Sequence, residues 1–247
     1  MFTKLMASVG IGAAKVDTLI LTEQLQPGQP FEIEIVITGG NVEQQINGLH
    51  LALMAQAEVE SGDREGLQSL ILHDWALDES FTIAAGEEVR DQFQLQLPEE
   101  TPITLLPRCR NQTRVWLQTG LDIASGKDGS DRDFLPIAPT ATMSNVITAM
   151  AQCGFSLYSA DIEKGNLHGD GFQSSIGCYQ ELEFRPSGFG GFSIKEVEVS
   201  FVLQGGITHV MLEVDRRFSG DGLLCLHLDD NSSVADAAEQ IRQRLRL

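Results

Sequence analysis

The segment from Phe31 to Ile37 constrains the fold of this chain more than any other. An aromatic or aliphatic residue occupies each odd-numbered position, and glutamate occupies positions 32 and 34. This period of two places the apolar side chains on one face of an extended strand and the acidic ones on the other. Pro27-Gly28-Gln29-Pro30 before the segment and Gly39-Gly40-Asn41 after it favour turns. The pattern therefore predicts a half-buried strand in a sheet with one face toward a core.

Similar short runs recur through the first half of the chain, separated by turn residues. Residues 16–138 contain no convincing helical pattern. Seven or eight strands at short intervals are typical of an antiparallel β-sandwich. We expect strands over residues 16–21, 31–38, 46–59, 67–75, 81–83, 89–97, 114–123 and 133–137.

The pattern changes at Pro139 and Thr140. Apolar residues in 142–154 follow helical spacing, and Gly154 favours a helix end there. Strands are expected again over 155–162, 180–185, 194–203 and 207–216, and a terminal helix over 232–245, capped by Asn231 or Ser232. We predict an all-β protein of two immunoglobulin-like sandwich domains, residues 1–138 and 139–247, with a short bridging helix and a C-terminal helix.

The charge of the chain limits its partners. The formal net charge of the 247 residues is −18. An acidic surface repels phosphate, which argues against a broad nucleic-acid interface and against adsorption to anionic lipid. A basic protein, a divalent cation or simple solubility is compatible with this charge, and solubility is the expected reason. After the N-terminal residues, no apolar run is long enough to span a bilayer, so no integral membrane segment is expected.

Motifs for catalysis or cofactor binding are absent from the sequence. The four cysteines form no C-x-x-C pair, and there is no nucleotide-binding glycine loop and no G-x-S-x-G. We therefore predict no cofactor, no metal and no catalytic residue. Thinly spread cysteines are typical of reduced thiols, so we expect a cytoplasmic protein.

The N-terminal residues form a possible contact tip. Phe2, Leu5, Met6 and Val9 fit one face of a short helix. This face either docks on the first domain or is exposed and binds a partner. The segment has one positive charge and two glycines within a short apolar stretch, so cleavage as a signal peptide is not expected.

Several segments together resemble the sporulation-control proteins of the arrestin-like type. Val115-Trp116-Leu117-Gln118-Thr119-Gly120-Leu121-Asp122-Ile123 is similar to that family. The other matching segments are residues 7–18, 39–44, 97–104, 131–133 and 210–217. The resemblance implies two arrestin-like sandwiches and a cytoplasmic, non-enzymatic protein linked to developmental or stress regulation.

One charged triplet is a candidate for a structural role. Asp131, Arg132 and Asp133 lie at the end of the first predicted domain. Arrestin-like proteins hold buried polar clusters, so the resemblance implies an ionic cluster between the domains. A solvated surface trio is the alternative, and such a trio contributes little stability.

Three function hypotheses follow. The first is a scaffold or regulatory adaptor that binds unidentified protein partners, for example by pairing a peptide with an open strand edge. The second is a metal-dependent enzyme that uses His73 and Asp74, the one adjacent His/Asp pair. The third is a self-assembling protein, such as a homodimer, that associates through the helices at 142–154 and 232–245.

Overall fold

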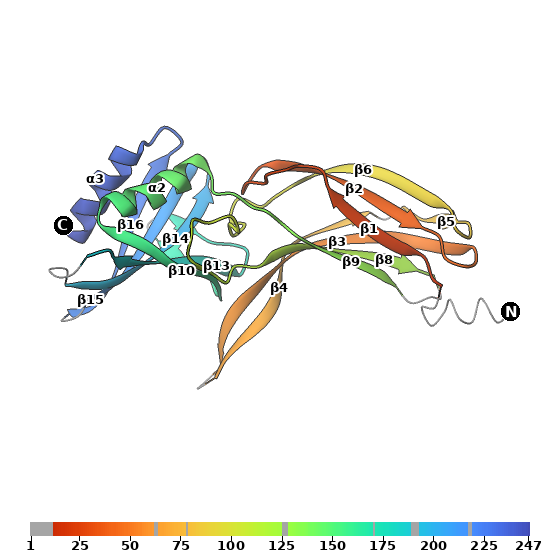
Figure 1. Ribbon diagram of the computed structural model, residues 1–247, viewed down its shortest axis with the longest axis horizontal. Coiled ribbons are helices and arrows are strands. Elements are labelled where there is room, and N and C mark those ends of the chain that lie inside the picture. The colour runs from red at the N-terminus through yellow and green to blue at the C-terminus, as the bar shows by residue number, and fades with distance from the viewer. Residues whose placement is uncertain are drawn as a thin grey trace.

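The computed structural model describes residues 12–61, 64–77, 79–124, 128–169, 171–188, 193–216 and 219–247. These residues form an elongated molecule whose two lobes lie end to end along its long axis (Figure 1). Most of the described chain is extended, and the predicted all-β class is confirmed. No described helix is both long and apolar enough to cross a membrane.

The N-terminal lobe consists of two layers of strands. Its smaller sheet has the order β1-β2-β6, from β1 (Lys15–Ile20), β2 (Pro30–Thr38) and β6 (Glu88–Gln96). The facing layer is built around β3 (Gln44–Ser61), which pairs antiparallel with its neighbours. The strands of this layer besides β3 are β4 (Arg64–Leu77), β5 (Phe81–Ile83), β8 (Val115–Ile123) and β9 (Gly129–Phe134).

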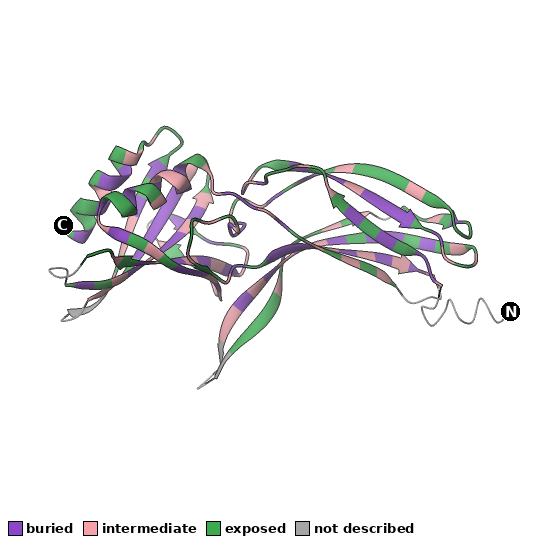
Figure 2. Cartoon of the chain, viewed as in Figure 1, coloured by how far each residue is buried: buried purple, intermediate pink, exposed green. Residues whose placement is uncertain are grey.

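The alternation in residues 31–37 has the predicted consequence. The side chains of Phe31, Ile33, Ile35 and Ile37 are at most 3% exposed. They share a hydrophobic core with apolar residues of β3 and β8, so the two layers are held together by burial. Buried and exposed residues alternate along these strands in Figure 2.

The C-terminal lobe is a sheet covered on one face by helices. Its antiparallel order is β16-β15-β14-β13-β10. Helices α2 (Ala141–Gln152) and α3 (Val234–Leu245) share one hydrophobic cluster with this sheet and lie on the same side of it (Figure 1). The strands are β10 (Phe155–Lys164), β13 (Cys178–Pro186), β14 (Ile194–Gln204), β15 (Ile207–Arg216) and β16 (Ser219–Asp229). Short strands β11 (His168–Gly169) and β12 (Phe172–Gln173) form a small hairpin.

The two helices have a larger structural role than the sequence indicated. We expected α2 to bridge two sandwiches, but α2 and α3 together form the layer that packs on the sheet. The cap of α3 is Ser233 and not Asn231 or Ser232, because Ser233 and Asp236 form a reciprocal capping box. The Ser232 hydroxyl donates instead to Asp229 at 2.9 Å.

A buried amide joins the lobes. The Gln180 side chain of β13 accepts a hydrogen bond from the backbone N–H of Ile103 at 3.0 Å and donates to the Ile103 carbonyl at 2.8 Å. It also donates to the Thr113 hydroxyl at 2.8 Å. The sheets themselves meet where β10 pairs parallel with β3 at Glu163 and Glu58, and with β7 (Arg110–Asn111). Strand pairing and a satisfied polar contact therefore both connect the lobes.

Candidate functional site

The structure separates the members of the charged triplet. Asp131, Arg132 and Asp133 are consecutive on β9, so the side chain of Arg132 points to the opposite side from the two aspartates. The Arg132 guanidinium lies 4.8 Å from the ring centroid of Trp116, and no described ion pair joins it to either aspartate. The predicted ionic cluster of these three residues is not formed, because strand alternation prevents it.

The two aspartates lie within the N-terminal lobe, at the seam between β1 and β9. Asp131 accepts a hydrogen bond from the backbone N–H of Thr18 at 2.8 Å. Burial, followed by the charge of Asp131, raises the pKa of Asp133 to about 7. The carboxylates of Asp17, Asp131 and Asp133 therefore lie close together at this seam, within the N-terminal lobe.

The other predicted candidates have different outcomes. Phe2, Leu5, Met6 and Val9 lie outside the described residues. His73 and Asp74 are exposed neighbours on β4, where they point to opposite sides. The apolar faces of α2 and α3 pack into the C-terminal core, so neither face is free to bind a second copy.

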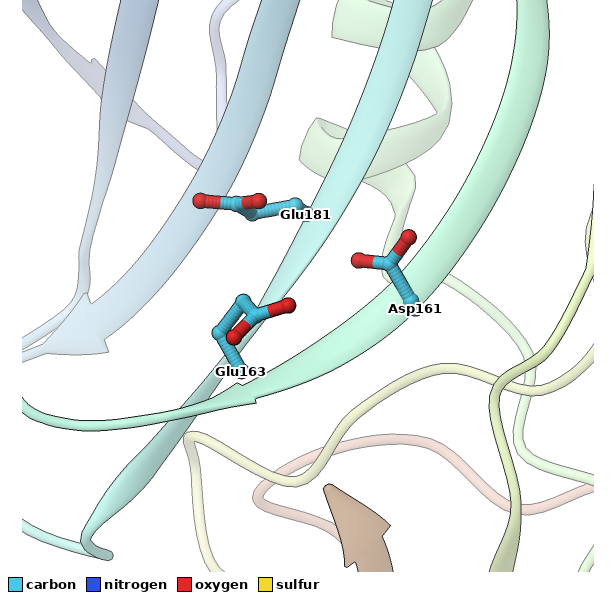
Figure 3. A group of neighbouring side chains, drawn as sticks. All are labelled: Asp161, Glu163 and Glu181. Carbon is cyan, nitrogen blue, oxygen red and sulfur yellow. The ribbon is translucent and has the colours of Figure 1, made fainter. Parts of the chain in front are cut away.

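The outer face of the C-terminal sheet, opposite the helices, is acidic. Alternate residues of four neighbouring strands point to this face. Figure 3 shows Asp161 and Glu163 on β10 and Glu181 on β13 as neighbouring side chains of this face. The other acidic side chains at these alternate positions are Glu183, Glu196, Glu198, Glu213 and Asp215.

Crowding of these carboxylates changes their protonation. Burial, followed by the charge of Glu198, raises the pKa of Glu181 to about 8. Burial and then Glu213 raise the pKa of Glu198 to about 7. Burial and then Glu58 raise the pKa of Asp161 to about 6. Desolvation and like charge both favour the neutral acid, so this face binds protons near neutral pH.

Carboxylate oxygens are also ligands for hard cations. Two groups of described residues have ligand atoms within 4.8 Å of one another, Asp161 with Glu163 and Glu181, and Glu181 with Glu198 and Glu213. Neither group contains His73 or Asp74. The metal-compatible geometry of the described chain is therefore on the C-terminal sheet and not at the pair that the sequence suggested.

An apolar cleft opens between the two layers of the N-terminal lobe. It has a volume of about 530 Å³ and lies between β6 and the end of β4. Its apolar lining includes Ile35, Leu49, Leu77, Phe81 and Phe93. Leu77, Phe81 and Phe93 are partly exposed in the cleft, so it is suited to apolar groups of a partner.

The strands on either side of this cleft have unpaired outer edges. In the described chain β4 pairs with β3 and β6 pairs with β2. The β6 edge carries Glu88, Arg90 and Asp91, whereas residues 66–72 of β4 contain no charge and no proline. Leu67 and Ile71 are 64% and 61% exposed there. Charges and proline protect natural strand edges against pairing, so the β4 edge is the less protected one.

Sequence reasoning identified the strands of these regions but not the sites. The alternation of Glu196 and Glu198, and of Glu213 and Asp215, was visible in the sequence. Nothing in it indicated that the two strands would be neighbours with their acidic faces on the same side. The cleft is lined by residues that are far apart in the sequence, between positions 35 and 93. No local sequence pattern predicts that they lie close together.

Comparison with known proteins agrees with the fold. The model of the Spo0M family, described as SpoOM protein, matches residues 2–218. The sporulation-control protein spo0M of Bacillus subtilis (strain 168) is 35% identical over 220 residues, which cover 89% of this chain and 82% of that protein. The crystal structure of Spo0M from Bacillus subtilis superposes with a TM-score of 0.83 at 29% identity, covering 96% of this chain and 99% of that one. The chain belongs to the Spo0M family.

Proposed function

We propose that this protein is a non-enzymatic regulatory scaffold of the cytoplasm that binds an extended segment of a partner protein. The name of the Bacillus subtilis relative, a sporulation-control protein, supports a regulatory role in development. The arrestin-like architecture supports partner binding by a rigid β scaffold. The surface that binds the partner determines what kind of partner segment fits.

The observation that carries this proposal is the apolar cleft beside the open edge of β4. An added strand along β4 satisfies its unpaired backbone groups, and its alternate side chains reach the surface of the lobe. The segment that pairs beside Ala76 and Leu77 places apolar side chains in the cleft. The same segment then continues past Ile71 and Leu67.

The energetics favour an apolar segment. Burial of one large aliphatic or aromatic side chain contributes about 1.5–3 kcal/mol. Two such side chains in the cleft and contacts on Leu67 and Ile71 give a specific complex once the ordering of the segment is subtracted. Hydrogen bonds to β4 fix the register of the segment, and each contributes about 0.5–1.5 kcal/mol.

The two lobes are proposed to be separate domains that divide near Ala138 and Pro139. Separate hydrophobic clusters support this division, one mainly from the residues before 139 and one mainly from those after 145. Ile162 and Cys178 pack into the first cluster, which gives the domains a shared apolar contact. Binding in the first domain then leaves the acidic face of the second available.

A photo-cross-linking experiment tests the proposed function. A photoreactive phenylalanine analogue replaces Leu77 beside the cleft, and a matched control replaces Leu223, which is exposed on β16. We expect one extended, apolar partner segment to be cross-linked from position 77 and not from position 223. A synthetic peptide of that segment should bind the full chain, and Ile71→Lys should weaken it at least about tenfold.

Two outcomes would contradict the scaffold. Cross-linking to a second copy of the chain would make the protein self-assembling. Equal binding of the peptide to the wild type and to both Ile71→Lys and Phe93→Gln would remove the cleft and the β4 edge from recognition. The melting temperature of each variant shows that a lost contact is not a lost fold.

A further inference from the structure

Two histidines face each other across the last two strands of the C-terminal sheet. His209 of β15 and His227 of β16 are directly opposed in the antiparallel register. Their Nδ1 atoms are 2.8 Å apart, and their rings meet edge to face with 5.0 Å between centroids. Two ring nitrogens are thus directed at the same small volume.

The next opposed pair on the same face supplies two sulfur atoms. Met211 and Cys225 are paired across the same strands, each two residues from a histidine. Side chains two residues apart on a strand point to the same side. Opposed Cβ atoms are about 5 Å apart, so the two pairs are neighbours on one face and form a block of four side chains. The ligand atoms of His209, His227 and Cys225 do not all lie within 4.8 Å of one another as these described side chains stand, so the sulfur side chains must rotate to reach a shared ion.

The surroundings of this block are apolar. Phe172 of the β11–β12 hairpin stacks on His209 with 4.7 Å between ring centroids. Met211 belongs to a buried cluster with Phe172 and other apolar side chains, and Cys225 packs against it. His209 is 8% exposed, whereas His227 on the outer strand is exposed and leaves a route from solvent.

Burial, with a further contribution from His227, lowers the pKa of His209. The neutral imidazole is the form that binds a metal. The hard carboxylate ligands are on other positions of this face, among them Glu213, two residues beyond Met211. The block itself offers nitrogen and sulfur donors.

We propose that His209, His227, Met211 and Cys225 form a binding site for one Cu(I) ion. Thiolate and thioether ligands select soft ions, and imidazole is a good ligand for copper. A site with one thioether and an apolar cover suits a monovalent ion better than Zn²⁺, whose sites are built from thiolate, imidazole and carboxylate. The Nδ1 atoms must separate slightly, and the two sulfur side chains rotate toward them.

The protons balance in this step. In the free protein one Nδ1 carries the hydrogen that joins the two rings. On metal binding that imidazole changes to the tautomer with its proton on Nε2, so it releases none. The Cys225 thiol releases one proton as its sulfur binds copper. Copper remains Cu(I), and no oxidant or reductant is consumed.

The test is a competition titration of the full chain with Cu(I) against a coloured copper chelator, under anaerobic conditions. We expect one equivalent to bind with release of one proton. The exposed His227→Gln should weaken binding at least about tenfold, as should Met211→Leu. Cys225→Ser should weaken binding and abolish the proton release, and His73→Gln and Cys109→Ser should change nothing.

X-ray absorption separates this site from copper bound elsewhere. We expect nitrogen and sulfur neighbours in the wild type and one sulfur fewer in Met211→Leu. Absence of Cu(I) uptake, or uptake with the same affinity in all three site variants, would overturn the proposal and leave the histidine pair as a hydrogen bond within the fold. Melting temperatures with and without copper confirm that the variants are folded.

Discussion

The two lobes leave different parts of their sheets uncovered. In the N-terminal lobe two layers of strands face each other, and what is left open is the edge of β4 with the cleft beside it. In the C-terminal lobe two helices cover one face of the sheet, and the opposite face is open and acidic except where the β11–β12 hairpin packs on β14 and β15. An open edge offers backbone hydrogen bonds and apolar contact, whereas an open face offers side-chain charge. The lobes therefore differ in the chemistry of what they can bind.

The largest expected effect compares the two faces of β15. Leu212 is fully buried under the helices, and the next residue, Glu213, points to the acidic face. Leu212→Ala should lower the free energy of unfolding by about 2–5 kcal/mol, because it leaves a cavity. Glu213→Ala should leave it unchanged or raise it, since it removes charge repulsion. Chemical denaturation measures both, and equal losses would show that the acidic face contributes packing.

The next effect concerns the contact between the lobes. Gln180→Ala removes three hydrogen bonds and leaves the buried N–H and C=O of Ile103 without their partner. An unfolding free energy lower by about 2–4 kcal/mol is expected from those unsatisfied groups. The exposed Gln92→Ala is the matched control. An unchanged stability in Gln180→Ala would mean that the lobes are not held at this point.

The acidic face should make stability depend on pH. The pKa of Glu181 is raised from 4.5 to about 8, so between these values the folded chain keeps a proton that the unfolded chain has released. Stability contributed by this group is therefore present below about pH 4.5 and is lost as the pH rises toward 8. Glu181→Gln should remove most of this slope and stabilise the protein at pH 8 by about 1–2 kcal/mol.

The melting temperature as a function of pH measures this slope. The exposed Glu43→Gln is the control, and it should leave the slope as in the wild type. A slope of the opposite sign, or one that Glu181→Gln does not change, would mean that the carboxylates are not crowded in solution.

The smallest effect is at the seam of the N-terminal lobe. The pKa of Asp133 is raised from 3.8 to about 7, so its ionisation disfavours the folded state as the pH rises through this window. Asp133→Asn should raise the unfolding free energy at pH 8 by less than about 1 kcal/mol, because the side chain is partly solvated. At pH 5 thermal melting should show almost no difference. If Asp133→Asn lowered the unfolding free energy at both pH values, the Asp133 carboxylate would instead make a favourable contact in the folded protein.

The sequence predicted the structure where the pattern within a single strand or helix determines which of its side chains are buried. Alternation in residues 31–37 predicted the buried face of β2, and the helical spacing of Met143, Val146 and Met150 predicted their burial. Alternation also explains why Arg132 and Asp133 separate, a consequence that the charged triplet alone concealed. The acidic face and the cleft depend on which strands are neighbours. That information lies in long-range packing and not in any local pattern.

The most direct test of the scaffold proposal is amide hydrogen exchange of the full chain, measured with and without the synthetic peptide of the partner segment that cross-linking identifies. An added strand should protect the outward-facing amides of β4 between residues 66 and 77. Ile71→Lys should abolish this protection while the exchange of β15 stays as it was. Protection confined to the strands of the acidic face, with none on β4, would contradict the account and move partner binding to the C-terminal lobe.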